Sequence, residues 1–180
     1  MMCQDIFIEV SHGPTLIDNN LLLSQAALRL PTQGVAVVHN LILGSITSIG
    51  QNTDHPGKDD QPRYTPYHIP HRTEVMGFMT ILHGDMRFYN NIFLQGSDPS
   101  RIIAPEEDEK IVGTHVFDGY PTLEEWESCF GLDQPFVDMR ETAKYHFSHL
   151  PVQAAGNVYL GGARPWASEK DAFVDKENHV

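Results

Sequence analysis

Basic side chains are scarce in this sequence. The 180 residues contain 12 Lys and Arg against 24 Asp and Glu, which gives a formal net charge of −12. Nucleic acids and anionic membranes draw most of their protein-binding energy from clustered Lys and Arg. The sequence therefore predicts no nucleic-acid partner and no membrane partner.

Cysteine and long apolar runs are scarce as well. Two cysteines, Cys3 and Cys129, form neither a disulfide framework nor a cysteine-type zinc site. No stretch approaches the roughly 20 apolar residues of a membrane helix, and the N-terminal residues lack a signal-peptide pattern. The composition fits one soluble domain with no metal and no other cofactor, and it slightly favours a cytoplasmic location.

The most informative feature of the sequence is a short repeat that occurs four times. In each copy an Asn precedes three large apolar residues, and a Ser or Gly follows within two positions. The first two copies lie 20 residues apart, and the four copies are Asn20–Leu23, Asn40–Leu43, Asn91–Leu94 and Asn157–Leu160. Short strands separated by bend-forming residues, with a period near 20 and no helix between copies, are typical of a parallel β-helix. The repeat then predicts that Asn20, Asn40 and Asn91 are aligned at one bend, where their side chains can form a hydrogen-bonded ladder. An antiparallel β-sandwich with repeating hairpins is the alternative.

The repeat also predicts the domain organisation. The longer gaps between copies contain insertions at 51–73 and 98–150. Residues 1–165 are thus expected to form one solenoid with two insertions, and 166–180 a polar tail.

Local patterns add further elements. The apolar runs 75–82 and 86–89 predict strands. Thr122 and Glu125 form a capping-box pattern, which predicts a short helix over 123–130.

Glu9 is the first candidate catalytic residue. In a strand with a period of two, Ile6, Ile8 and Val10 share one face, and Phe7, Glu9 and Ser11 share the other. Apolar neighbours favour the protonated form of a carboxyl, which is the form that a general acid needs. A solvated Glu on an outer face is the plainer interpretation.

A second cluster lies in the proline-rich stretch 62–74. Aromatic rings can cover the C–H surfaces of a sugar, while His, Arg and Glu can bond its hydroxyls. With His12 from the turn after Glu9, the candidate substrate-binding residues are His12, Tyr67, His68, His71, Arg72 and Glu74. A surface loop stiffened by proline is the alternative, and the His68-x-x-His71 spacing is a weak metal signal. Asp18 and Asp85 are expected to be bend residues.

Several ordered motifs in this chain resemble one enzyme family. The motifs are DIFIEVSHGPTLIDNNLLLS, GVAVVHNLILGSI, TPYHIPHRTEV and HGDMRFYNNIFLQG. Together they are similar to the glycoside hydrolase family 120 β-xylosidases. The resemblance implies a right-handed parallel β-helix of the pectate-lyase-like kind and a retaining mechanism with an aspartate nucleophile and a glutamate acid/base. Glu9 matches the glutamate of the family's EV-x-HGP motif.

The sequence departs from the family in one respect. In the family the nucleophile lies one turn before this glutamate, and this chain begins a few residues before Glu9. We therefore expect a partial chain that carries the acid/base but not the nucleophile, and that has little or no β-xylosidase activity by itself.

Stacking of strands accounts for the distance that such a pair requires. The carboxyl groups of a retaining glycosidase lie about 5–5.5 Å apart. Neighbouring strands lie about 4.7–4.9 Å apart. Two outward carboxyls in one column of a solenoid would therefore have a suitable separation.

Two other functions stay open. A non-catalytic glycan-binding module would need no nucleophile, and a β-helix polysaccharide lyase would need a calcium-binding carboxylate cluster and a Lys or Arg base. The expected ligands are β-xylosides and xylo-oligosaccharides. Exposed strand edges also predict pairing with another chain.

Overall fold

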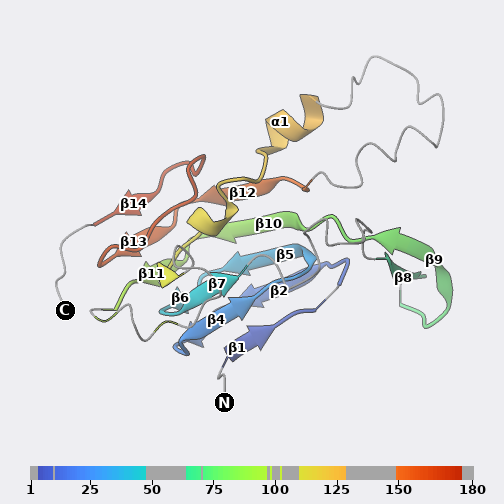
Figure 1. Ribbon diagram of the computed structural model, residues 1–180, viewed down its shortest axis with the longest axis horizontal. Coiled ribbons are helices and arrows are strands. Elements are labelled where there is room, and N and C mark those ends of the chain that lie inside the picture. The colour runs from blue at the N-terminus through green and yellow to red at the C-terminus, as the bar shows by residue number, and fades with distance from the viewer. Residues whose placement is uncertain are drawn as a thin grey trace, which may run out of the picture.

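The structure is a computed structural model (Figure 1), and it describes residues 4–9, 11–47, 64–69, 71–96, 98, 102, 110–128 and 149–175. These residues are mainly β, with little helix: α1 (Leu123–Ser128) and the 3-10 turn η3 (His115–Phe117). Much of both expected insertions, 51–73 and 98–150, lies outside the described residues.

Most strands belong to three parallel sheets. The first sheet has the order β1 (Gln4–Phe7), β4 (Ala26–Arg29), β7 (Ser45–Thr47). The second has the order β12 (Val152–Ala155), β10 (Gly84–Tyr89), β5 (Gln33–Val38), β2 (Thr15–Asp18). The third has the order β14 (Phe173–Val174), β13 (Val158–Leu160), β11 (Ile92–Leu94), β6 (Leu41–Ile42), β3 (Leu21–Leu22). Pairing is parallel in all three, so the alternative of an antiparallel sandwich is wrong.

The repeated asparagines form a hydrogen-bonded ladder at the bend between the second and third sheets. Asn40 Oδ1 accepts from the backbone N–H and the side-chain amide of Asn20, at 2.9 and 3.0 Å. Asn91 Oδ1 accepts in the same way from Asn40, and Asn157 Oδ1 from Asn91. Glu169 Oε1 accepts from Asn157 Nδ2 at 2.6 Å and ends the ladder. The alignment expected from the repeat is confirmed.

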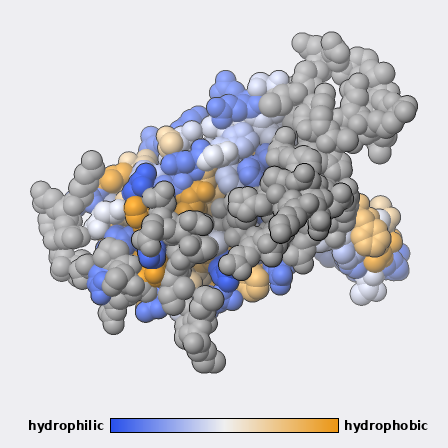
Figure 2. Space-filling view, in the orientation of Figure 1, coloured by the Kyte–Doolittle hydropathy of each residue, from blue (hydrophilic) through white to orange (hydrophobic). Residues whose placement is uncertain are grey.

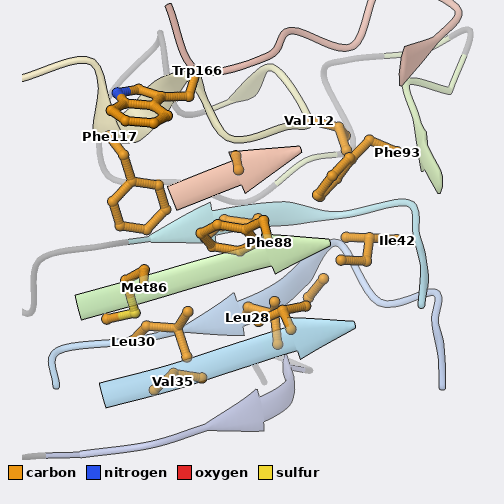
Figure 3. Close-up of a cluster of buried hydrophobic side chains, with 14 of the residues drawn as sticks. Leu28, Leu30, Val35, Ile42, Met86, Phe88, Phe93, Val112, Phe117 and Trp166 are labelled. Carbon is orange, nitrogen blue, oxygen red and sulfur yellow. The ribbon is translucent and has the colours of Figure 1, made fainter. Parts of the chain in front are cut away.

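The core lies between the three sheets (Figure 3). Inward side chains from each sheet are fully buried, and Leu28, Val35, Met86, Phe88, Ile42 and Phe93 all have 0% exposure. Phe93 stacks on Tyr159 with ring centres 4.9 Å apart. Burying one such side chain contributes about 1.5–3 kcal/mol, so this cluster is the main force that holds the sheets together.

One pair of strands is antiparallel. β8 (Tyr64–His68) and β9 (Val75–Thr80) form a hairpin that stands away from the three sheets (Figure 1). Residues 75–80 are therefore a strand, as expected, but they do not join the parallel stack. The hairpin exposes apolar side chains, seen in orange at the right of Figure 2, which are Val75, Met76 and Phe78 at 51, 61 and 71% exposure.

This arrangement corrects the predicted right-handed parallel β-helix. A closed solenoid places a strand of every turn in each sheet. In the described residues the sheets have three, four and five strands, the first sheet ends at β7, and the hairpin comes between β7 and β10. Long insertions interrupt the repeat, so the regular spacing of the first two copies did not extend along the chain. The fold is a mainly β stack of open parallel sheets.

The helix α1 begins as its capping box predicts. Thr122 Oγ1 accepts from the backbone N–H of Glu125 at 3.2 Å, and the Glu125 carboxylate accepts from the Thr122 backbone N–H at 2.8 Å. These hydrogen bonds lower the pKa of Glu125. Nothing among the described helices is long and apolar enough to cross a membrane.

The segment expected to be a polar tail packs on the sheets in part. Lys170 forms a parallel bridge to Ala155, and β14 pairs with β13.

Candidate functional site

The candidate site lies on the segment that links β1 to β2. Ile6 and Ile8 are partly buried against the core, whereas Phe7 and Glu9 are exposed. For residues 6–9 this is the alternation expected from the sequence, and it directs Glu9 away from the core; Val10 lies outside the described residues. The guanidinium carbon of Arg29 lies 5.6 Å from the centre of the Phe7 ring, which adds a cation to the exposed face of β1.

Hydrogen bonds to the chain before β5 fix the turn that follows Glu9. The Ser11 N–H donates to Thr32 Oγ1 at 3.0 Å, and this hydroxyl donates to the Ser11 carbonyl at 2.7 Å. Gly13 has φ +73°, and a Cβ there would lie 2.4 Å from the Gly34 carbonyl oxygen. The turn that begins two residues after Glu9 is therefore held in one conformation.

The imidazole of His12 is held between the second sheet and the hairpin. Gln33 Nε2 lies 3.3 Å from His12 Nδ1, and the hydroxyl of Thr65 contacts His12 Nε2. The Leu82 N–H donates to Gln33 Oε1 at 2.9 Å, which fixes the orientation of the amide. The amide therefore donates to Nδ1, so Nε2 carries the imidazole proton.

Burial lowers the pKa of His12 below its ordinary value of 6.5. A second proton on the ring would place an N–H of His12 against an N–H of Gln33, and the two donors would repel. At neutral pH His12 is consequently a neutral imidazole that donates from Nε2 to Thr65. It connects the base of the hairpin to the turn that follows Glu9.

The remaining predicted sugar-binding residues all lie on the hairpin: Tyr67, His68, His71, Arg72 and Glu74. The structure brings the base of the hairpin to His12 through Thr65. His68 Nδ1 lies 3.2 Å from a backbone carbonyl of the hairpin turn, and Arg72 Nη1 lies 3.9 Å from Glu74 Oε1. Arg72 and Glu74 are exposed in the turn between the two strands. Their assignment to substrate binding stays a prediction.

Sequence reasoning missed Gln33 and Thr65, which hold His12. A weak signal was present, since His12-Gly13, Gln33-Gly34 and His83-Gly84 are the same kind of polar–Gly pair. In the structure Gly84 is paired with Gln33 at the start of neighbouring strands. His83 is buried and immediately precedes β10, so it lies at the same end of the second sheet as Gln33.

Other nearby carboxylates make local contacts. Asp5 accepts from the backbone N–H and the hydroxyl of Ser24, at 2.9 and 2.6 Å. Asp18 accepts from the neighbouring side-chain amide at 2.9 Å. Asp85 forms an ion pair with Arg87 at 2.7 Å. Each of these carboxylates already supports a bend or a strand.

The described residues supply groups for proton transfer and for hydrogen bonding to hydroxyls. Glu9 is an exposed carboxyl before the turn, and His12 is a neutral imidazole three positions further along the chain. Among the described residues, no group of three or more His, Cys, Asp or Glu could hold a metal ion. The exposed carboxylate of Glu9 can therefore form hydrogen bonds with a polar ligand, whereas both ring nitrogens of His12 already have protein partners.

Comparison with known proteins gives one strong structural likeness. No protein-family model matches the chain, and no curated protein matches it. The chain is similar to a solved structure of XylC in complex with xylose, with 34% sequence identity and a TM-score of 0.71. The likeness covers 97% of this chain and 24% of the XylC chain, so this chain spans about a quarter of the length of that protein.

Proposed function

We propose that this chain belongs to a xylose-acting glycoside hydrolase that resembles the family 120 β-xylosidases. The observation that carries the proposal is the likeness to XylC, which was solved with xylose and matches nearly all of this chain. The fixed turn after Glu9 supports it, because an acid/base catalyst must be held in one position.

In the proposed mechanism, Glu9 acts twice. Its carboxyl first gives a proton to the glycosidic oxygen as the bond from that oxygen to the anomeric carbon breaks and a nucleophilic carboxylate bonds to that carbon. Glu9, now ionised, then removes a proton from water, and the resulting oxygen displaces the nucleophile from the sugar. The anomeric configuration is retained after the two displacements.

As the family resemblance implies, we place the nucleophile of this scheme outside the described residues. Asp5, Asp18 and Asp85 each make local contacts, and none of these contacts joins them to Glu9. We expect the nucleophile to be an aspartate on a strand beside β1, because neighbouring strands give the separation of about 5 Å that a retaining pair requires.

The test is the Glu9→Gln change in the full-length natural protein. Two substrates are compared: xylobiose, whose leaving group needs a proton, and 2,4-dinitrophenyl β-xyloside, whose leaving group does not. If Glu9 is the acid/base, xylobiose hydrolysis falls by about 10²- to 10⁴-fold, and added azide restores turnover of the aryl xyloside by replacing water as the second nucleophile.

The matched control is Asp171→Asn, which also removes one carboxylate. Asp171 is exposed and has φ +58°, a conformation that Asn tolerates well. The control should keep normal activity on both substrates. Equal loss on both substrates for Glu9→Gln, with no rescue by azide, would contradict the assigned role.

A non-catalytic glycan-binding module is the second candidate. The local contacts of Asp5, Asp18 and Asp85 favour it, because they leave these carboxylates in supporting roles. Xylo-oligosaccharide binding by the full-length protein, without hydrolysis, would select this candidate.

A further inference from the structure

A cleft of about 510 Å³ lies at the opposite edge of the second sheet from β2. It is an open cleft lined by residues of α1, the end of β10, β12 and the chain from Trp166 to Lys170. Its polar lining includes Tyr89, Glu124, Glu127, Gln153, Ser168 and Lys170, and most of its other lining residues are apolar. The volume is within the range of about 300–1,000 Å³ that is usual for small-molecule sites.

Two of the lining residues are fixed by hydrogen bonds. The Tyr89 hydroxyl donates to Gln153 Oε1 at 2.9 Å, which leaves the amide nitrogen as the group that Gln153 can offer as a donor. The backbone of Lys170 bonds to β12, with its N–H donating to the Ala154 carbonyl at 3.2 Å. Lys170 thus extends the edge of the sheet into the cleft wall.

The helix adds two acceptors from the other side. Glu124 and Glu127 are three positions apart and so lie on neighbouring parts of one helix face. Both line the cleft, whereas Glu125 is occupied by the capping box with Thr122. The short helix therefore has a consistent orientation, with one carboxylate closing its N-terminus and two facing the cleft.

This lining suits a neutral, polyhydroxylated ligand. Carboxylates accept from sugar hydroxyls, Lys170 and Gln153 donate to them, and the Tyr89 ring offers a surface for C–H groups. An apolar ligand would force three charged groups to lose water without a partner. An anionic ligand would meet two carboxylates against one ammonium group.

We propose that this cleft is a second carbohydrate-binding site, which holds a xylo-oligosaccharide away from Glu9. The cleft lies beside β12, and Glu9 lies on the segment that leads into β2. These two strands are three strand spacings apart, which corresponds to roughly 14 Å across the sheet. The choice of a xylose-based sugar rests on the proposed function, while the choice of a polyhydroxylated ligand rests on the cleft itself.

The experiment is a titration of the 180-residue chain with xylotetraose, followed by the amide NMR shifts of Tyr89, Gln153 and Lys170. We expect saturable shifts at these residues. Gln153→Leu and Lys170→Met should each weaken binding by roughly fivefold, the effect of losing one hydrogen bond. Asp171→Asn, next to Lys170 but outside the lining, should bind like the wild type. Unchanged urea midpoints establish that the variants fold.

Three outcomes would overturn the inference. They are the absence of shifts at the cleft, unchanged affinity in both lining variants, and inorganic phosphate shifting the same amides at lower concentration than xylotetraose. The result is separable from the proposed function. Shifts at the cleft, combined with normal hydrolysis by Glu9→Gln, would refute the catalytic role of Glu9 and leave this site standing. The absence of shifts at the cleft, combined with the expected loss of hydrolysis in Glu9→Gln, would refute this site alone.

Discussion

Replacing Asn91 by Leu should destabilise the protein far more than the same change at Asn20. Asn91 is fully buried in the middle of the asparagine ladder. Its amide donates to the Val37 carbonyl at 2.9 Å, and its Oδ1 accepts from the Asn40 backbone N–H at 3.0 Å. Leu has a similar size but can make neither bond, so two buried backbone groups lose their partners.

The expected cost follows from those two groups. A buried polar group without a partner costs about 1–3 kcal/mol, so Asn91→Leu should lower the free energy of unfolding by about 2–6 kcal/mol. Asn20 lies at the end of the ladder and is half-buried, and its amide bonds to the Asp18 carbonyl in an exposed position. Water can replace that bond, so Asn20→Leu should cost about 1 kcal/mol or less.

Urea unfolding of the wild type and the two variants measures the difference. The slope of the free energy against urea should stay constant, so that a change in midpoint reports stability. Equal losses for the two variants, or a larger loss for Asn20→Leu, would refute the argument that the buried ladder holds the second and third sheets together.

Three further predictions concern the candidate site. Gly13→Ala should lower the free energy of unfolding by at least about 2 kcal/mol, because it combines a positive φ with a blocked Cβ position; Gly77→Ala, where a Cβ meets nothing within 4 Å, is the control in the same urea assay, and similar losses would count against this reason. The lowered pKa of His12 means that the imidazole binds its second proton more tightly in the unfolded chain than in the folded one. The contribution of neutral His12 to stability is therefore present above pH 6.5 and declines as the pH falls below it. When the pH is lowered from 7.5 to 5.5, the urea midpoint should fall further for the wild type than for His12→Asn, and an equal fall would disprove this linkage. The 180-residue chain should release little or no aryl group from an aryl β-xyloside, and robust turnover that disappears in Asp18→Asn or Asp85→Asn would identify one of these carboxylates as the nucleophile.

The asparagine ladder could be predicted from the sequence because it is built from a local repeat. Each Asn lies at the same point relative to its strand, and parallel stacking then brings the side chains together. The closed solenoid could not be inferred in the same way. The number of strands in each sheet depends on where the chain returns after each insertion, and the four Asn segments contain no information on that path.

The hairpin and the partners of His12 show the same limit at the candidate site. The apolar run 75–82 indicated a strand but not its direction, because direction depends on the pairing strand. Gln33 and Thr65 are 21 and 53 residues away from His12, and no local pattern links them to it. The orientation of Glu9 was predictable because it depends only on the alternation with Ile6 and Ile8.

The most direct test of the proposed site is a titration of the ¹⁵N-labelled 180-residue chain with xylose, followed through the side-chain signals of His12 and the backbone amides of Glu9 and Ser11. A sugar held at this edge should change the His12 imidazole shifts and both amide shifts with one common dissociation constant, and Glu9→Gln should weaken that binding while Asp171→Asn leaves it unchanged. Chemical-shift changes only at residues other than Glu9, Ser11 and His12, or the same xylose affinity in Glu9→Gln as in the wild type, would contradict the claim that Glu9 belongs to a xylose-binding site.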